Sequence, residues 1–240
     1  MMSKPEKIMA MKLTPESVGL ERRQYEAAIG YLFDRSEPSV AGAEWYWNID
    51  EPEFDATPLE WTRIQTLLFA NAGEDLAPFS DEQVGMGLNY LMNNAVSDVP
   101  HAAIHASVPM DEALRMMRAM PSLWRDCIGP RLADVWVPIG SSHGMLAFVC
   151  YMWFDVWPTF RLARELQPWK DAQWQVFAEM LHIPCREVQI AALHGIGHNA
   201  GYLDRRSVVD AAVNEFIGGI AAADEELKSY ALAARQGMVQ

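Results

Sequence analysis

The chain has 240 residues, of which 50% are apolar or aromatic, 32 are acidic and 19 are basic. This apolar content is enough for a hydrophobic core, so intrinsic disorder of the whole chain is excluded. The net charge of -13 argues against binding to a nucleic-acid backbone, because such binding needs basic side chains. Three cysteines in a chain of this length do not make a disulfide scaffold, and we expect reduced thiols in the core.

The sequence offers no segment that would direct the chain into or across a membrane. The most apolar run, Met145 to Phe154, is about half the ~20 residues that a spanning helix needs. The first residues carry charge without an apolar stretch or a small-residue cleavage site behind them. We therefore expect a cytoplasmic protein that does not contact a membrane.

Helix start and stop signals recur along the chain. Thr57 and Glu60 have the spacing of a capping box, with proline at the first helical position and apolar residues at helical spacing behind it. Ser80 and Gln83 repeat this pattern, and we expect that helix to end at Asn93 and Asn94, which tolerate the left-handed conformation that finishes helices. The predicted helices cover about 14–34, 57–68, 80–93, 109–127 with a kink at Pro121, 142–157, 168–182, 184–199, 204–217 and 221–236.

No hairpin turn joins two alternating apolar runs, so the sequence predicts an all-α fold. The run that ends at Trp157 is apolar nearly all round and should form a buried central helix, capped by Ser141 or Ser142. The last three helices have short links that fold each one back on the one before. Gly195 and Gly197 disfavour a helix, so either close packing of a neighbouring helix or a helix end near Gly201 must offset them. We expect antiparallel helix pairs stacked as a HEAT-like α-solenoid or bundle.

The first 56 residues differ from the rest of the chain. They combine a predicted helix with an irregular, acidic and tryptophan-rich segment, which we expect to pack on a main helical-repeat domain of residues 57–240 in one globular unit. In this segment, Glu37–Ala56, the residues Trp45, Tyr46 and Trp47 are consecutive. If buried, their rings form a lid over the core; if exposed, they form a recognition loop, because Trp and Tyr anchor protein interfaces.

The acidic residues concentrate in one window of the sequence. Ser36 to Leu114 holds fourteen Asp and Glu against a single base, Arg63, so the whole net charge arises there. One interpretation is a set of solvated helix faces that keep the protein soluble. The other is an acidic helical face that attracts a basic partner protein by electrostatic steering.

Three motifs occur in order within residues 57–218. They are Ser80-Asp81-Glu82-Gln83-x3-Gly87-Leu88-x-Tyr90-Leu91, Cys150-Tyr151-Met152-Trp153-Phe154-Asp155-x2-Pro158 and Cys185-x3-Gln189-x2-Ala192-Leu193-His194-Gly195-Ile196-Gly197-His198. Together they resemble a family of uncharacterised bacterial proteins with HEAT-like helical organisation. The resemblance implies a fold and a bacterial setting but no activity, and the first 56 residues and the tail lie outside it.

Two histidine pairs have the spacing of metal ligands. His194 and His198 lie four residues apart, which places both imidazoles on one helix face, and Glu187 lies about two turns earlier on that side. His101 and His105 repeat the spacing. If the pairs meet, they supply four nitrogen ligands to zinc or a similar divalent ion. If they do not, the imidazoles of the first pair cap helix ends or hydrogen-bond to buried carbonyl groups.

Several enzyme classes lack their characteristic residues. Neither histidine pair encloses the glutamate with which a metallopeptidase activates water. No glycine-rich phosphate loop or dinucleotide-binding turn is present. The cysteines Cys127, Cys150 and Cys185 form no Cys-x-x-Cys pair, so we expect them to be buried as small apolar groups.

Asp155 interrupts an otherwise apolar helix. A buried carboxylate must be paired or neutralised, so we expect an arginine to pair with it, and Arg125, Arg161 and Arg186 are the candidates. The alternative is a functional carboxylate in a pocket, which a perturbed pKa would mark.

These observations predict a non-catalytic helical-repeat protein without a cofactor, which binds a basic protein partner through the acidic face within Ser36–Leu114. The candidate binding residues are Trp45, Tyr46, Trp47 and Asp155. The alternative is a metal-binding protein or metal-dependent enzyme centred on His194 and His198, with the other histidine pair or Glu187 assisting. Nothing in the sequence predicts the oligomeric state.

Overall fold

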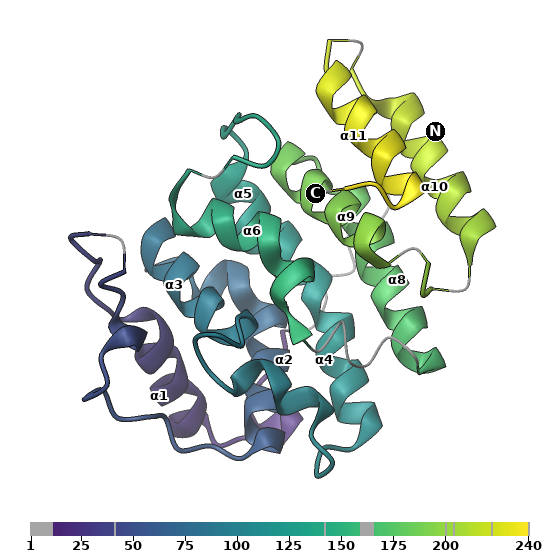
Figure 1. Ribbon diagram of the computed structural model, residues 1–240. Helices are drawn as coiled ribbons and strands as arrows, with labels where there is room; N and C mark the ends of the chain where they lie inside the picture. Colours follow the sequence, from purple (N-terminus) through teal and green to yellow (C-terminus); the bar gives the residue numbers. More distant parts are fainter. Residues whose placement is uncertain are drawn as a thin grey trace, which may run out of the picture.

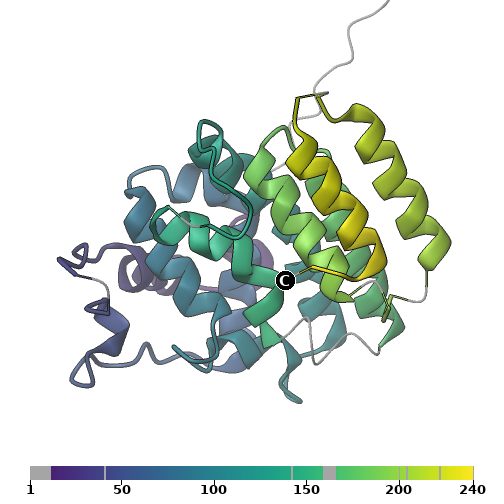
Figure 2. The same ribbon diagram turned by 45° about the horizontal axis from the view of Figure 1, so that its top comes forward.

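A computed structural model describes residues 12–40, 42–141, 143–158, 166–199, 201–203, 205–221 and 223–239. Every regular element among these residues is helical, which confirms the predicted all-α class. The helices pack on one another as a bundle or solenoid that runs from α1 on one side to α10 and α11 on the other (Figure 1, Figure 2). The HEAT-like order of the repeats stays a prediction. Each described helix is too short or insufficiently apolar to cross a bilayer.

The first predicted helix consists of two elements. A 3-10 turn, η1 (Glu16–Val18), ends at Gly19, and the helix α1 (Arg22–Phe33) begins after it. Gly19 has a φ of 76°, a left-handed conformation that carries no Cβ penalty in glycine, and the chain then turns so that Leu20 is buried. The expectation of one continuous helix over residues 14–34 was therefore wrong.

Both predicted capping boxes are present, at the starts of α2 (Pro58–Asp75) and α3 (Asp81–Met92). In each, the hydroxyl of the cap residue accepts a hydrogen bond from the backbone three residues on, and that residue's side chain accepts one from the cap N–H. α3 ends where expected, and its C-cap residue Asn93 has an extended conformation, with a φ of -104°.

Two glycines allow α3 to lie tightly between α1 and α6 (Gly144–Val156). A Cβ atom on Gly85 would stand 2.5 Å from the backbone nitrogen of Leu146, which belongs to α6. A Cβ atom on Gly87 would stand 2.8 Å from the carbonyl oxygen of Leu32, which belongs to α1. The helix axes can approach this closely only because both positions lack a side chain.

The type of helix changes close to the predicted kink. α4 (Met110–Leu123) contains Pro121, which has no N–H to donate to the helix ladder. A π-helical turn, η4 (Trp124–Ile128), follows directly and leads into the short α5 (Gly129–Leu132). The ring of Trp124, at the start of this turn, is buried in the core.

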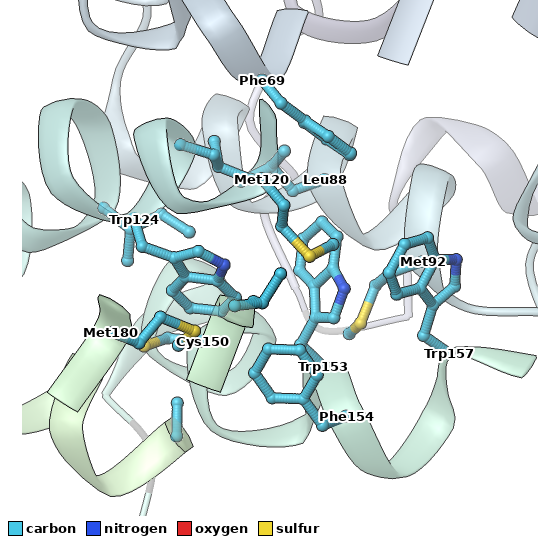
Figure 3. Close-up of a cluster of buried hydrophobic side chains, with 14 of the residues drawn as sticks. Phe69, Leu88, Met92, Met120, Trp124, Cys150, Trp153, Phe154, Trp157 and Met180 are labelled. Atoms are coloured by element: carbon cyan, nitrogen blue, oxygen red, sulfur yellow. The ribbon is translucent and has the colours of Figure 1, made fainter. Parts of the chain in front are cut away.

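α6 is the central helix that the sequence predicts, because it packs against both α3 and α9 (Arg186–Asn199). Its Trp153 is fully buried, and the ring meets those of Trp124 and Phe69 edge to face, with centroids 5.6 and 6.0 Å apart (Figure 3). The predicted thiols Cys127, Cys150 and Cys185 are also buried and free.

The start of α6 is capped by another helix and not by a neighbouring serine. The N-cap residue is His143, whose side chain makes no capping hydrogen bond, and Ser142 lies outside the described residues. Instead, the Glu82 carboxylate on α3 accepts a hydrogen bond of 3.2 Å from the N–H of Met145. The expected serine cap was therefore wrong at Ser141, because a carboxylate from the adjacent helix satisfies the free N–H group.

The last helices are α8 (Gln167–Leu181), α9, α10 (Arg206–Gly219) and α11 (Glu225–Gln236). α9 packs against α5, α6, α8 and α11. Gly195 faces the ring of Phe177 on α8 so closely that a Cβ would clash, which is the close packing that the glycine predicted. Two short 3-10 turns complete the fold, η2 (Trp45–Trp47) and η3 (Val99–Ile104).

The contact between α3 and α6 yields a stability prediction. We expect Gly85→Ala to lower the free energy of unfolding by about 1–3 kcal/mol, because the new methyl group meets backbone that cannot move cheaply. Gly30→Ala is the matched control: Gly30 lies in α1 with nothing within 4 Å, so alanine should be neutral or stabilise by about 1 kcal/mol. Urea unfolding of both variants measures the difference, and equal effects would contradict the tight contact.

Candidate functional site

His194 lies on α9 between α6 and α11 and is 2% exposed. Its Nδ1 is 2.7 Å from the hydroxyl oxygen of Tyr230, which in turn lies 3.4 Å from the hydroxyl oxygen of Tyr151. The His194 ring also packs on the Tyr151 ring, with centroids 4.4 Å apart. No described residue forms a hydrogen bond with Nε2 of His194. The hydroxyl groups of Tyr151 and Tyr230 and the buried imidazole of His194 thus lie in a row.

His194 and Tyr230 are uncharged at neutral pH. Burial, and to a smaller extent the neighbouring His198, lower the pKa of His194 to about 4, although the carboxylate of Asp155 opposes this shift. Burial and the adjacent Tyr151 hydroxyl raise the pKa of Tyr230. A neutral imidazole bonded to a neutral phenol is a satisfied polar contact in a helix interface. The partner is a tyrosine hydroxyl, where the sequence predicted a carbonyl group or a helix end.

The surroundings of this imidazole do not form a ligand set. His198 is exposed, and its ring is nearly perpendicular to that of His194, with centroids 4.5 Å apart. The Glu187 carboxylate lies 3.5 Å from the Arg186 guanidinium, and burial raises its pKa. Within the residues that the structure describes, no three His, Cys, Asp or Glu side chains gather where they could hold a metal ion. The zinc alternative therefore has no structural support in this part of the chain.

The two histidine pairs lie on elements with different main neighbours, and they form no common cluster among the described residues. η3, which carries His101, packs against α2, α3 and α4, whereas α9 packs against α5, α6, α8 and α11. His105 interacts locally, with its Nδ1 2.8 Å from the Ser107 hydroxyl oxygen. The condition for a four-histidine site is therefore not met.

Asp155 is half-buried on α6, near His194. Two of the arginines expected to pair with it have other partners: Arg125 pairs with the adjacent Asp126 at 2.7 Å, and Arg186 pairs with Asp224 at 3.0 Å. These two expectations were wrong, and the third candidate, Arg161, lies outside the described residues.

The three consecutive aromatic residues are divided between the interior and the surface. Trp45 stacks on Tyr90 of α3, with ring centroids 5.0 Å apart and planes at 30°. The amide of Asn89 donates a 2.8 Å hydrogen bond to the hydroxyl of Tyr46. Trp47, by contrast, is 50% exposed. The segment is thus both a lid, through the first two rings, and an exposed surface, through the third.

An arginine is enclosed within this aromatic cluster. The guanidinium of Arg35 lies over the rings of Trp45 and Tyr31, 4.4 and 4.7 Å from their centroids. The same guanidinium forms an ion pair of 2.6 Å with Glu51. Two ring faces and one carboxylate therefore hold this cation.

Many acidic residues of the window have partners within the molecule. Arg63 pairs with Glu112 at 2.8 Å, and Arg131 pairs with Asp81 at 2.6 Å. Others accept hydrogen bonds at helix ends or from nearby groups. These are Glu37, Glu44, Glu60 and Glu82. The helical part of the predicted acidic face is therefore largely engaged in internal contacts.

Most of the acids without such partners lie in or beside residues 36–56, which we name the acidic loop, and Asp111 on α4 is a further one. Asp50, Glu53 and Asp55 within it, and Asp98 before η3, are exposed and form no ion pair with a described residue. Large apolar side chains are exposed in the same loop: Ile49 is 97% and Val40 is 66% exposed. The surface that combines unpaired acids with exposed apolar groups is therefore a loop, where the sequence predicted a helical face.

A pocket of about 460 Å³ opens between the acidic loop and η3. Its aromatic walls are Phe54, Trp61 and Tyr90, and carboxylates come from Glu53 and Asp98. The imidazoles that line it are those of His101 and His105. We name it the acid–aromatic pocket. Sequence reasoning missed it, because its residues come from segments whose packing no local pattern predicts.

A larger apolar cavity, of about 690 Å³, lies among α8, α9, α10 and α11. It exists because α10 packs loosely, with only Val209 and Val213 buried among its described side chains. Arg186 lines the cavity, but its guanidinium already contacts the Trp136 ring and the Asp224 carboxylate. The carboxylates that line the cavity are those of Asp224, which pairs with Arg186, and Glu215, which is exposed.

Comparison of the chain with models of protein families, with curated proteins and with solved structures finds no match. The resemblance to bacterial HEAT-like proteins accordingly stays a prediction. Function must be inferred from the geometry alone.

The low pKa of His194 yields a prediction about pH. In the unfolded chain a histidine titrates near pH 6.5, so between pH 6.5 and 4 the unfolded state binds a proton that the folded state does not. The free energy of unfolding should therefore fall when the pH is lowered from 7 to 5. This fall should be about 2 kcal/mol larger in the unmodified chain than in His194→Gln. Urea unfolding at both pH values tests this.

Exposed His182 provides the control for this titration. His182→Gln should show the same pH dependence of unfolding as the unmodified chain. His182→Gln and His194→Gln each lose one imidazole, but only the imidazole of His194 is buried. A pH dependence that is the same in His194→Gln and in the unmodified chain would mean that His194 is not the buried neutral group.

Proposed function

We propose that this chain is a non-catalytic binding protein of the cytoplasm, built on a HEAT-like helical scaffold, which recognises a basic protein partner through the acidic loop. The observation that carries the proposal is the set of exposed carboxylates at Asp50, Glu53 and Asp55 that no described base neutralises. Such a set attracts a partner of opposite charge and raises its association rate.

The exposed apolar side chains of the same loop support the proposal independently of charge. Trp47 and Ile49 are 50% and 97% exposed, directly beside the acids. Burying Ile49 against a partner would contribute about 1.5–3 kcal/mol to the free energy of binding. The solvated carboxylates alone do not provide such a contribution. An apolar centre with a charged rim is the usual composition of a protein interface.

The position of the loop also favours recognition. Because Trp45 is stacked on Tyr90, the loop presents its carboxylates from a fixed base on α3. A surface that is already ordered loses less conformational entropy on binding. The loop lies on the side of the molecule away from α10 and α11 (Figure 1, Figure 2), so a partner can reach it without displacing those helices.

A site-specific cross-link tests the proposed surface. A photoreactive residue in place of Ile49 should capture a protein that the same residue in place of Val208, 48% exposed on α10, does not capture. The captured protein is then identified and purified, and its Kd is measured as salt rises from about 0.05 to 0.5 M. We expect a basic partner whose Kd rises steeply with salt.

Charge variants of equal net charge complete this test. Asp50→Asn with Asp55→Asn should raise the Kd of the purified complex about 3- to 30-fold at low salt, because two attractive charges are lost. Asp134→Asn with Glu215→Gln removes two exposed charges elsewhere and should leave Kd nearly unchanged. Capture at both cross-linking positions, or an affinity indifferent to salt, would rule out the acidic loop as the interface.

A further inference from the structure

The acid–aromatic pocket has a composition suited to one class of ligand. Trp61 and Tyr90 are nearly buried and form its interior, and Phe54 meets Trp61 with ring centroids 5.4 Å apart. Glu53 and Asp98 line the same pocket and are exposed at its mouth. None of the described residues that line it is Lys or Arg. Ring faces attract cations through their quadrupole, and carboxylates attract them through charge, so the pocket is complementary to an organic cation.

The protein itself holds a cation with the same kinds of group nearby. Arg35 is enclosed by Tyr31 and Trp45 and paired with Glu51. Trp45 also stacks on Tyr90, a wall of the acid–aromatic pocket, so the two sets of rings belong to one cluster. The internal site demonstrates that rings and a carboxylate in this part of the fold accommodate a guanidinium group.

We infer that the acid–aromatic pocket binds an arginine side chain of the partner protein, an inference that rests on the proposed function. Arginine fits better than lysine for two reasons. Its planar guanidinium stacks on aromatic rings and is weakly hydrated, whereas the lysine ammonium is a compact, strongly hydrated charge. Its several N–H donors also allow it to bond to Glu53 and Asp98 together, since these carboxylates line one pocket.

The pocket can be tested without the partner. The probe is N-acetyl-arginine N-methylamide, added to the full chain while the indole N–H signal of Trp61 is followed by NMR. We expect a saturable shift with a Kd on the order of 1 mM, typical of a ligand of this size. The citrulline analogue has nearly the same shape without the charge and should bind at least about tenfold more weakly. The lysine analogue should also bind several-fold more weakly.

Variants assign the effect to the two carboxylates. Asp98→Asn with Glu53→Gln should weaken binding of the arginine probe about tenfold, since both attractive charges of the pocket are lost. Both side chains are exposed, so folding should be retained, as urea unfolding can verify. Asp134→Asn with Glu215→Gln is the matched control, because it also removes two exposed charges but neither residue lines the pocket. Equal binding of the arginine and citrulline probes, or an unchanged Kd in the double variant, would overturn the inference, and equal binding of lysine would overturn its specificity.

The failure of this inference is distinguishable from failure of the proposed function. If Asp50→Asn with Asp55→Asn weakens the purified complex while Asp98→Asn with Glu53→Gln does not, the acidic loop is the interface and the pocket is not part of it. If the arginine probe binds as expected but cross-linking at Ile49 yields no basic partner, the pocket stands and the proposed function does not.

Discussion

The stacking of Trp45 on Tyr90 holds the acidic loop on α3, together with the hydrogen bond that Asn89 donates to Tyr46. The backbone hydrogen bonds of the loop are local, such as those from Trp47 to Glu44 and from Asn48 to Trp45, so they do not tie it to the helices. Tyr90 in turn is a fixed platform, because α3 is held between α1 and α6 through Gly87 and Gly85. A close helix contact in the core is thereby linked to a charged surface at the edge of the molecule.

The distribution of charge follows from what each carboxylate contacts. On the helices, acids serve the fold: Glu60 completes a capping box, Glu82 caps the adjacent helix and Asp81 pairs with Arg131. Arg35, directly before the acidic loop, is the nearest base in sequence and is already paired with Glu51. The exposed carboxylates of Asp50, Glu53 and Asp55 thus remain without a described counter-charge.

Sequence patterns predicted the local features and missed those that depend on packing. The capping boxes at Thr57 and Ser80 follow from residue types at fixed spacing, so they could be predicted. The carboxylate cap of α6, the partner of His194 and the acid–aromatic pocket each join residues far apart in the chain, and no spacing rule connects them. The four-residue spacing of His194 and His198 predicted a shared helix face, but burial then left one imidazole inside and the other in solvent.

Amide hydrogen exchange of the acidic loop tests the central claim most directly. The N–H groups of Trp47 and Asn48, which donate to Glu44 and Trp45, should be protected in the unmodified chain and exchange on the order of 100-fold faster in Trp45→Ala. Amides of α2 and α3 should keep their protection, because the core does not depend on the loop. Exchange of the loop at the rate of an unstructured chain before any substitution, or protection that survives the loss of the Trp45 ring, would contradict the claim that this stack positions the carboxylates.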